Sequence, residues 1–403
     1  MNTSFKADAS PGDRGDSRAV GANDSHSAFR IPHSALDPAP DSAPGSALAK
    51  HRRAPLKIAV VGAGWVTGAR HLPALLASRR CQVLGVVDRR IEQATAMAKK
   101  FKLSYAASDL DAPWLNEIDA TTIGVSPMSH YETASALLRQ GKHVLVEKPL
   151  CLTVAEGEAL VELAEHQRRV LAVVHNFQFA RSVQAALRQL QSGSWGRVTG
   201  LHGLQLSNER RRLPSWYEEL PGGLFYDESP HLLYLLRAFA GQLDLRDAQV
   251  VPSRQPRSTP AIVQARFEAE CGPATLFMNF EAPVSEWFLF VFTERGMAVI
   301  DIFRDVLHFV PNDGQHTARD IARSSWRLLS GHVCGFAASG WRLVTRRLRY
   351  GNDEVVKRFF DAVQGIAPLR DIAPQAALDV LRWQHAILDH EPAEHADRTM
   401  AAM

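Results

Sequence analysis

One short run near residue 60 constrains the fold of this chain more than any other feature. Residues 57–61, Lys-Ile-Ala-Val-Val, are almost entirely apolar and rich in β-branched side chains, and they lead into Gly62-Ala63-Gly64. Such a run is typical of a strand buried on both faces of a parallel sheet. Glycines in the following turn let a pyrophosphate approach the backbone at the start of the next helix. The run therefore predicts a strand–loop–helix unit that binds a dinucleotide.

Strands and helices are predicted to alternate over the next 110 or so residues, as in a doubly wound parallel sheet. We therefore predict an α/β fold that begins with a Rossmann domain over residues 56–177. Beyond the first strand, the expected strands are 83–87, 120–125, 143–146 and 170–174, and the expected helices are 66–78, 91–100, 131–139 and 154–166.

The pattern changes after residue 178, where several strand candidates follow one another with short turns. Some of them alternate apolar and polar side chains, which predicts an open, mostly antiparallel sheet. We interpret residues 178–390 as an α+β domain for substrate binding and oligomerisation. Its expected strands are 197–206, 248–251, 261–268, 274–281, 287–293 and 298–303, and its expected helices are 180–191, 231–240, 355–363 and 376–388.

Composition narrows the remaining possibilities. Residues 1–55 are rich in Ala, Ser, Asp, Pro and Gly and cannot offset their chain entropy by burial, so we predict a disordered tail or an over-extended reading frame. Residues 391–403 are a second predicted tail. The net charge of +3 gives no reason to expect nucleic acid, and no apolar run is long enough for a transmembrane helix. Four widely separated cysteines suggest neither disulfides nor a metal site, so we expect a cytoplasmic protein without a metal.

The glycine loop has a predicted partner on the second strand. Asp88 ends that strand near the spacing expected of a carboxylate that binds the adenosine ribose. Thr67 replaces the third glycine of the usual pattern. Asp88 favours NAD because it would repel the 2′-phosphate of NADP, whereas Arg89 and Arg90 could attract that phosphate. We expect NAD(P), with NAD slightly favoured, to contact Gly62, Gly64, Trp65, Val66, Asp88 and Arg89.

Two further patterns suggest acid–base chemistry. Lys148 follows the strand predicted at 143–146, and ligands bind at the carboxyl ends of such strands. It could hydrogen-bond a substrate oxygen, or it could be a surface charge. Asp227 and His231 are four residues apart and share a face if their segment is helical. The carboxylate could raise the basicity of the imidazole, which could then accept the proton of an alcohol; the alternative is a helix-terminal Asp beside a half-buried His.

Together these segments resemble the glucose–fructose oxidoreductase, inositol dehydrogenase and rhizopine-catabolism (Gfo/Idh/MocA) family. The resemblance covers roughly residues 56–390 and rests on the glycine loop followed by His71, on Ser-Pro-Met-Ser-His at 126–130, on Glu-Lys-Pro at 147–149, and on residues 222–231. It implies a Rossmann domain followed by a domain with an open antiparallel sheet, through which a homodimer or homotetramer would form. It also implies a cis bond between Lys148 and Pro149.

The resemblance also implies roles for single residues. Lys148, Asp227 and His231 would be catalytic, with Lys148 and His231 handling oxygen and proton and Asp227 supporting His231. Further cofactor contacts would come from Ser126, Pro127, His130, Glu147 and Lys148, and substrate contacts from Lys148, Asn176, Gln178, Asp227 and His231.

The implied reaction is hydride transfer between NAD(P) and a secondary alcohol of a sugar, nucleotide sugar or cyclitol. Two alternatives stay open: a transient-redox glycosidase or epimerase, and a non-catalytic NAD(P)-binding sensor or scaffold. Ser229, Tyr234 and Gln178 stand where the family usually has Gly, Asp and Arg, so the set of polar groups in the pocket is altered.

Residues 324–350 look additional relative to that family. They mix large apolar side chains with arginines. A basic amphipathic segment can lie on an anionic membrane or cover a partner, and it can also be a packed helical insertion or a dimer contact.

Overall fold

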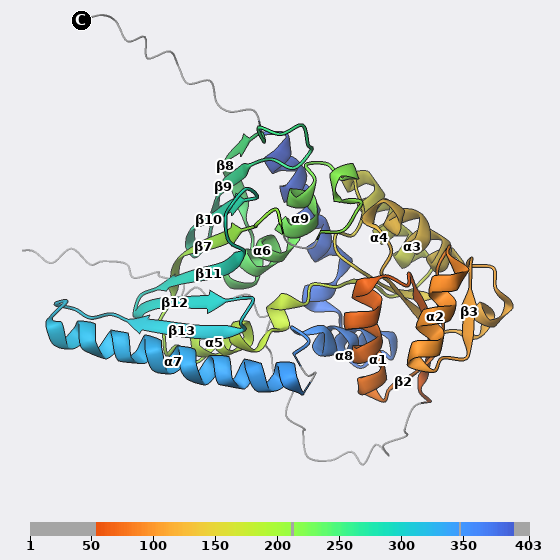
Figure 1. The fold of residues 1–403 in the computed structure, drawn as a ribbon. Coiled ribbons are helices and arrows are strands. Elements are labelled where there is room, and N and C mark those ends of the chain that lie inside the picture. Colours follow the sequence, from red (N-terminus) through yellow and green to blue (C-terminus); the bar gives the residue numbers. More distant parts are fainter. Residues whose placement is uncertain (1–53, 211–212, 346–347, 391–403) are drawn as a thin grey trace, which may run out of the picture.

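Two β-sheets organise the computed structural model, which describes residues 54–210, 213–345 and 348–390 (Figure 1). One sheet has six parallel strands, and the other has seven strands in mixed, mostly antiparallel order. The predicted α/β fold, a Rossmann sheet followed by an open antiparallel sheet, is therefore confirmed. The predicted tails lie outside the described residues, apart from Ala54 and Pro55.

The parallel sheet is formed by apolar runs that are buried on both faces. In β1, Ile58, Ala59 and Val60 are fully buried and point alternately to opposite faces. Helices on both faces exclude water from these side chains, as a parallel sheet requires. Across the sheet the strands are β3 (Tyr105–Ala107), β2 (Cys81–Val87), β1 (Leu56–Val61), β4 (Ala120–Ile123), β5 (His143–Val146) and β6 (Leu171–Val173).

Helices from both ends of the described chain cover this sheet. One face packs against α1 (Leu72–Ser78), α2 (Ile91–Phe101) and α8 (Asn352–Val363). The other packs against α3 (His130–Arg139), α4 (Val154–His166) and α9 (Pro374–Leu388). The domain division that we predict at residue 177 stays a prediction, and the late helices α8 and α9 pack on the parallel sheet.

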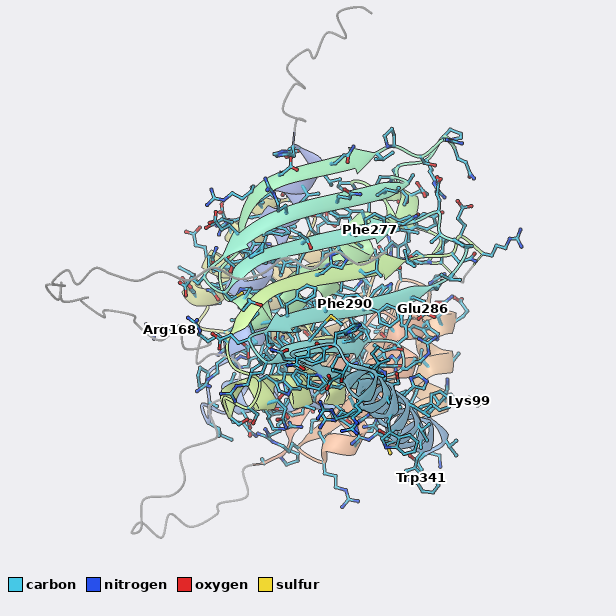
Figure 2. All side chains as sticks on the ribbon, turned by 90° about the vertical axis from the view of Figure 1, so that its left-hand side faces the viewer. Lys99, Arg168, Phe277, Glu286, Phe290 and Trp341 are labelled. Atoms are coloured by element: carbon cyan, nitrogen blue, oxygen red, sulfur yellow. The ribbon has the colours of Figure 1, made fainter. Side chains whose placement is uncertain are left out.

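The second sheet has one covered face and one open face. Helices α5 (Arg181–Gln191), α6 (Leu224–Ala240) and α9 bury its inner face. Outward-facing side chains include Phe277 and Phe290, which are only partly buried (Figure 2). Across the sheet the strands are β13 (Val306–Pro311), β12 (Gly296–Asp301), β11 (Glu286–Thr293), β7 (Val198–Leu206), β10 (Gly272–Asn279), β9 (Ile262–Ala269) and β8 (Asp244–Val251).

A long helix, α7 (Ala318–Val344), lies along the edge strand β13 at the margin of the molecule (Figure 1). Thr317 and Asp320 form a capping box at its N-terminus. Small residues at intervals of four, Gly331, Gly335 and Ser339, face the strand side. A Cβ at position 335 would lie 2.8 Å from Val306 Cγ1, so the close approach depends on glycine.

We predict that Gly335→Leu displaces α7 from β13. The new side chain must enter space that the fully buried Val306 occupies, and such overpacking costs about 1–3 kcal/mol. Gly340→Leu is the matched control, because no heavy atom lies within 4 Å of a Cβ built there. Trypsin cleavage at the α7 arginines should accelerate in Gly335→Leu only. Equal cleavage rates in the two variants would contradict the packing role of Gly335.

Candidate functional site

The glycine loop after β1 leaves room for a ligand against the sheet. Gly62 has φ +97°, and a Cβ there would lie 2.6 Å from the carbonyl oxygen of Gly124. Only glycine tolerates both the backbone conformation and this close approach. At Gly64, by contrast, a Cβ would meet nothing nearer than 3.8 Å. A helical segment begins at Trp65, so the positive end of a helix lies directly after this open space.

The missing third glycine is compensated from another strand. Its usual role is to let the helix pack closely on the sheet. Here Thr67 is fully buried, and it lies against Gly124, the residue directly after β4. A Cβ at position 124 would lie 2.8 Å from Thr67 Oγ1 and 3.2 Å from Val66 Cγ1. The space that a glycine at position 67 would provide is thus supplied by Gly124.

Asp88 holds the loop in this conformation from the end of β2. Its Oδ2 accepts a hydrogen bond from the Ala63 N–H at 2.7 Å, and its Oδ1 accepts one from the Arg90 N–H at 3.0 Å. Arg90 Nε also lies 3.6 Å from Oδ1. Arg89 is exposed. The predicted cofactor residues Gly62, Gly64 and Asp88 therefore lie together around the turn.

Glu147 connects this loop to the lysine segment. Its Oε1 lies 2.8 Å from His71 Nε2, and its Oε2 accepts the Lys148 N–H at 3.2 Å. Burial alone would raise the pKa of Glu147, but the hydrogen bond and charge of His71, with the charges of Lys148 and His130, lower it overall. His71 follows the glycine loop in the π-helical segment Thr67–His71, so its contact with Glu147 fixes this helical segment against the end of β5.

His130 has a structural environment. It is fully buried, its Nδ1 lies 2.7 Å from the Pro149 carbonyl oxygen, and its Nε2 lies 3.3 Å from that of Val125. Burial lowers the pKa of His130. Both ring nitrogens face backbone carbonyls, so the side chain supports the segment around Pro149. The cofactor contact that we expect of His130 stays a prediction. Of the other predicted contacts, Ser126 and Pro127 lie at the carboxyl end of β4, in the turn that precedes α3.

Lys148 lies between the two sheets and contacts α6. Its Nζ donates hydrogen bonds to Asp227 Oδ1 and to the Asp227 main-chain oxygen, both at 2.6 Å. The two side chains are only 14% and 16% exposed, so each charge depends on the other. The Lys148–Pro149 bond is cis, as the resemblance implied. The structure therefore brings two of the three predicted catalytic residues into direct contact.

His231 has a different partner from the one we predicted. We expected Asp227 to support His231 and raise its basicity. Both lie on α6, but Asp227 binds Lys148, and His231 Nδ1 lies 2.8 Å from the Tyr234 hydroxyl. The Tyr234 oxygen also accepts the Phe177 N–H at 3.0 Å. The departure at position 234 thus supplies a phenol where the family usually has a carboxylate.

Burial and nearby positive charge keep His231 neutral. Desolvation lowers its pKa well below the usual value, and the charge of Lys148 acts in the same direction. Burial raises the pKa of Tyr234 well above its usual value, so the phenol also stays neutral. Lys148, Asp227 and His231 consequently provide a paired ammonium group and a neutral imidazole. Together these groups can polarise an oxygen and exchange a proton.

Aromatic side chains that the sequence analysis missed surround His231. Phe177 meets its ring edge-on at 4.8 Å between centroids, and Trp287 lies 5.4 Å away. Tyr350 packs on Phe177 at 5.5 Å and lies over the Arg70 guanidinium at 5.0 Å. These residues come from separate elements far apart in the chain. No local motif marks them, and the continuous apolar run Trp-Phe-Leu-Phe-Val-Phe in β11 does not reveal which of its side chains face inward.

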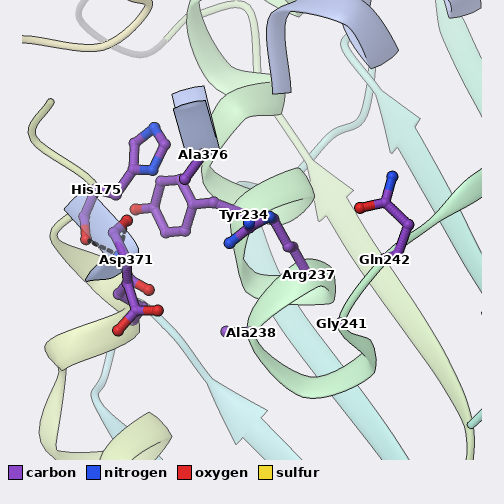
Figure 3. A pocket seen from close by; sticks show the side chains of 9 residues that line it. His175, Tyr234, Arg237, Ala238, Gly241, Gln242, Asp371 and Ala376 are labelled. Atoms are coloured by element: carbon purple, nitrogen blue, oxygen red, sulfur yellow. Dashed lines mark hydrogen bonds between the residues drawn. The ribbon is translucent and has the colours of Figure 1, made fainter. Parts of the chain in front are cut away.

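The two predicted substrate amides serve the backbone. Asn176 Nδ2 donates a hydrogen bond to the main-chain oxygen of Tyr350 at 2.9 Å. Gln178 Nε2 donates hydrogen bonds to the main-chain oxygens of His175 and Asp371 at 2.9 and 3.2 Å. Gln178 is one of the residues that line a cavity of about 120 Å³. Figure 3 shows two others, His175 and Tyr234, next to each other. Burial lowers the pKa of His175 to about 3. Asn176 and Gln178 therefore stabilise the backbone that forms the wall of the site.

Comparison with known proteins agrees with this geometry. Residues 56–175 match the model of an oxidoreductase family with an NAD-binding Rossmann fold, GFO_IDH_MocA. The first sheet and its helices are therefore similar to the NAD-binding domain of the Gfo/Idh/MocA oxidoreductases. An uncharacterized oxidoreductase from Synechocystis is 37% identical over 125 residues, 31% of this chain and 33% of that protein. D-glucoside 3-dehydrogenase from Escherichia coli is 29% identical over 176 residues, 42% of this chain and 49% of that protein.

Solved structures share the fold over more of the chain. Levoglucosan dehydrogenase, in complex with NADH, has a TM-score of 0.67 at 17% identity and covers 83% of this chain and 96% of its own. At this identity the likeness is one of fold alone. The two curated relatives are matched over a third to half of their length.

Among the described residues, no three His, Cys, Asp or Glu side chains converge as a metal site would need.

We predict that Thr67 and Gly124 are energetically coupled. Gly124→Ala should lower the free energy of unfolding by about 1–3 kcal/mol, because the added methyl group meets Thr67 and Val66. Thr67→Ala makes room for it, so the double variant should recover most of the loss. Denaturant unfolding of the four proteins gives the coupling energy. Additivity within about 0.5 kcal/mol would contradict the compensation.

Proposed function

We propose that this protein is an NAD(P)-dependent oxidoreductase that oxidises a secondary alcohol, or reduces the corresponding ketone, on a sugar, nucleotide sugar or cyclitol. The Lys148–Asp227 pair beside a neutral, buried His231 carries the proposal. Lys148 would hydrogen-bond the reacting oxygen, and His231 would accept or return its proton. General acid–base help of this kind contributes about 10²–10⁴-fold to a rate.

The cofactor would lie along the loop after β1. Gly62, Gly64, Trp65 and Val66 would face its pyrophosphate, and Asp88 its ribose. When bound, the nicotinamide would supply or accept the hydride. Asp88 supports NAD as the preferred form, because its carboxylate lies at the loop and would repel a 2′-phosphate. Exposed Arg89 is the feature that would favour NADP instead.

The substrate class is supported by the wall of the site and by relatives. Phe177, Trp287 and Tyr350 provide flat apolar surfaces near His231, against which the apolar face of a sugar or cyclitol ring can pack. Relatives matched over part of their length are named D-glucoside 3-dehydrogenase and, in Acidithiobacillus ferrooxidans, UDP-N-acetylglucosamine 3-dehydrogenase. The oligomer would be a dimer or tetramer formed through the open face of the second sheet.

Lys148→Ala should separate binding from turnover. Wild-type protein should gain thermal stability with one nicotinamide cofactor pair, by about 2.7 kcal/mol at 100 times the dissociation constant, and should form NADH or NADPH in a sugar and cyclitol screen. Lys148→Ala should keep most of the cofactor-induced shift and lose at least about 10² in kcat. The control is Lys100→Ala, which removes an exposed lysine.

Each other outcome selects an alternative. Substrate conversion without net reduced cofactor would identify a transient-redox glycosidase or epimerase. Cofactor binding without turnover of any tested alcohol, unchanged in Lys148→Ala, would identify a sensor or scaffold. No thermal shift with NAD, NADH, NADP or NADPH, in protein shown to contain no copurified nicotinamide, would refute the proposal.

Tyr234→Phe should reduce kcat while leaving cofactor binding intact. The change removes the hydroxyl that lies 2.8 Å from His231 Nδ1 and accepts the Phe177 N–H, so two buried polar groups lose their partner. We expect a fall in kcat of about tenfold or more, with an unchanged cofactor-induced thermal shift. Tyr105→Phe, at a tyrosine that is 41% exposed, is the control. Equal kcat in Tyr234→Phe and wild type would exclude a positioning role for the phenol.

A further inference from the structure

Helix α7 exposes an unusual amount of apolar surface. Within the described ranges, seventeen large apolar side chains are exposed, and nine of them lie on this one helix. Trp326 and Trp341 are each 69% exposed. A large exposed apolar patch of this kind marks an interaction site. The nine side chains are Ile321, Trp326, Leu328, Leu329, Val333, Phe336, Trp341, Leu343 and Val344.

The apolar surface points away from the protein. Gly331, Gly335 and Ser339 hold α7 against β13 and the Asp305 carbonyl. Two residues along a helix correspond to a rotation of about 200°, so Val333 and Trp341 lie across the helix from these contacts. Trp341 accordingly lies at the outer margin of the molecule, beyond the ribbon of α7 (Figure 2). The fold therefore presents this side of the helix outward along its whole length.

The charges of α7 are almost all positive. Arg319, Arg323, Arg327 and Arg342 are exposed, and Asp320 is the sole acidic residue among 318–344. Arg323 Nη2 lies 2.6 Å from Asp320 Oδ1, which leaves an excess of three positive charges on one helix. This sign selects an anionic partner, because basic side chains that flank an apolar face attract anionic surfaces.

We propose that α7 docks this protein on an anionic lipid bilayer. The helix would lie in the plane of the interface, with its tryptophans and aliphatic side chains among the acyl chains and its arginines at the headgroups. No helix in the described ranges combines the length and apolar character of a membrane span, so the contact is peripheral.

A second copy of α7 is a poorer occupant of the same surface. Two copies would bring like charges together, since each helix carries four arginines and one aspartate. The apolar arc is also wider than a coiled-coil seam, because it includes the sequence neighbours Leu328 and Leu329, and Leu343 and Val344, which a helix places about 100° apart. A broad, basic, apolar face fits a fluid anionic surface better than a narrow groove between helices.

The test is flotation of the full chain with vesicles. One set contains phosphatidylcholine with about a third phosphatidylserine, and the other phosphatidylcholine alone. We expect binding to the first set at about 0.1 M salt and its loss near 1 M, where the Debye length falls from about 10 to 3 Å. Val333→Glu with Trp341→Glu should abolish binding. Arg319→Gln, Arg323→Gln and Arg327→Gln together should weaken it by roughly a hundredfold, at about fivefold for each arginine.

Matched controls and opposing results decide the proposal. Ile366→Glu changes an apolar residue that is 59% exposed outside α7, and Lys99→Gln, Lys100→Gln and Arg139→Gln remove three exposed basic residues, so both variants should bind as wild type. No binding to anionic vesicles at low salt, or equal binding by all variants, overturns the proposal. A wild-type oligomer that dissociates in Val333→Glu with Trp341→Glu, without vesicle binding, assigns α7 to a contact between copies instead.

Discussion

The contact between Lys148 and Asp227 is the constraint on which the site depends. It joins the carboxyl end of the parallel sheet to the first turn of α6, through both the side chain and the main chain of Asp227. Because both charges are largely withdrawn from water, removing either leaves the other without compensation. Since α6 also carries His231, the same contact fixes the imidazole relative to the ammonium group. The chemistry proposed here thus rests on the docking of the two sheets.

Local patterns predicted the parts of the fold that local physics determines. The buried run before Gly62 predicted β1, and the alternation after it predicted the parallel sheet. The helix expected at 154–166 has the predicted bounds because a capping box at Thr153 and Glu156 fixes its start. Two strands escaped prediction. Tyr105–Ala107 is short and lacks β-branched residues, and Val306–Pro311 ends in a proline that is tolerated on an edge strand.

Sequence patterns single out residues of the candidate site, but they predict only some of the contacts among these residues. Lys148 and Asp227 are in the sequence patterns, but their pairing joins positions 79 residues apart, and no spacing rule reveals it. Gly124 compensates for Thr67 across 57 residues for the same reason. Spacing on one helix suggested Asp227 as the partner of His231. In the structure the Asp227 carboxylate pairs with Lys148, and His231 contacts Tyr234 on the same helix. Periodicity predicts which face of a helix a side chain lies on, whereas tertiary packing determines which residue it contacts.

The phenol at position 234 changes the proton affinity of the site. A carboxylate partner would stabilise a protonated His231 by charge, whereas a neutral hydroxyl stabilises it only as a hydrogen-bond acceptor. The Asp227 carboxylate balances the Lys148 ammonium, so protonating His231 gives these three side chains a net positive charge in a buried setting. An imidazolium formed there therefore gives up its proton readily. The same residues that make His231 a weak base make its conjugate acid a strong one, so this environment favours delivery of a proton to a carbonyl over its removal from an alcohol.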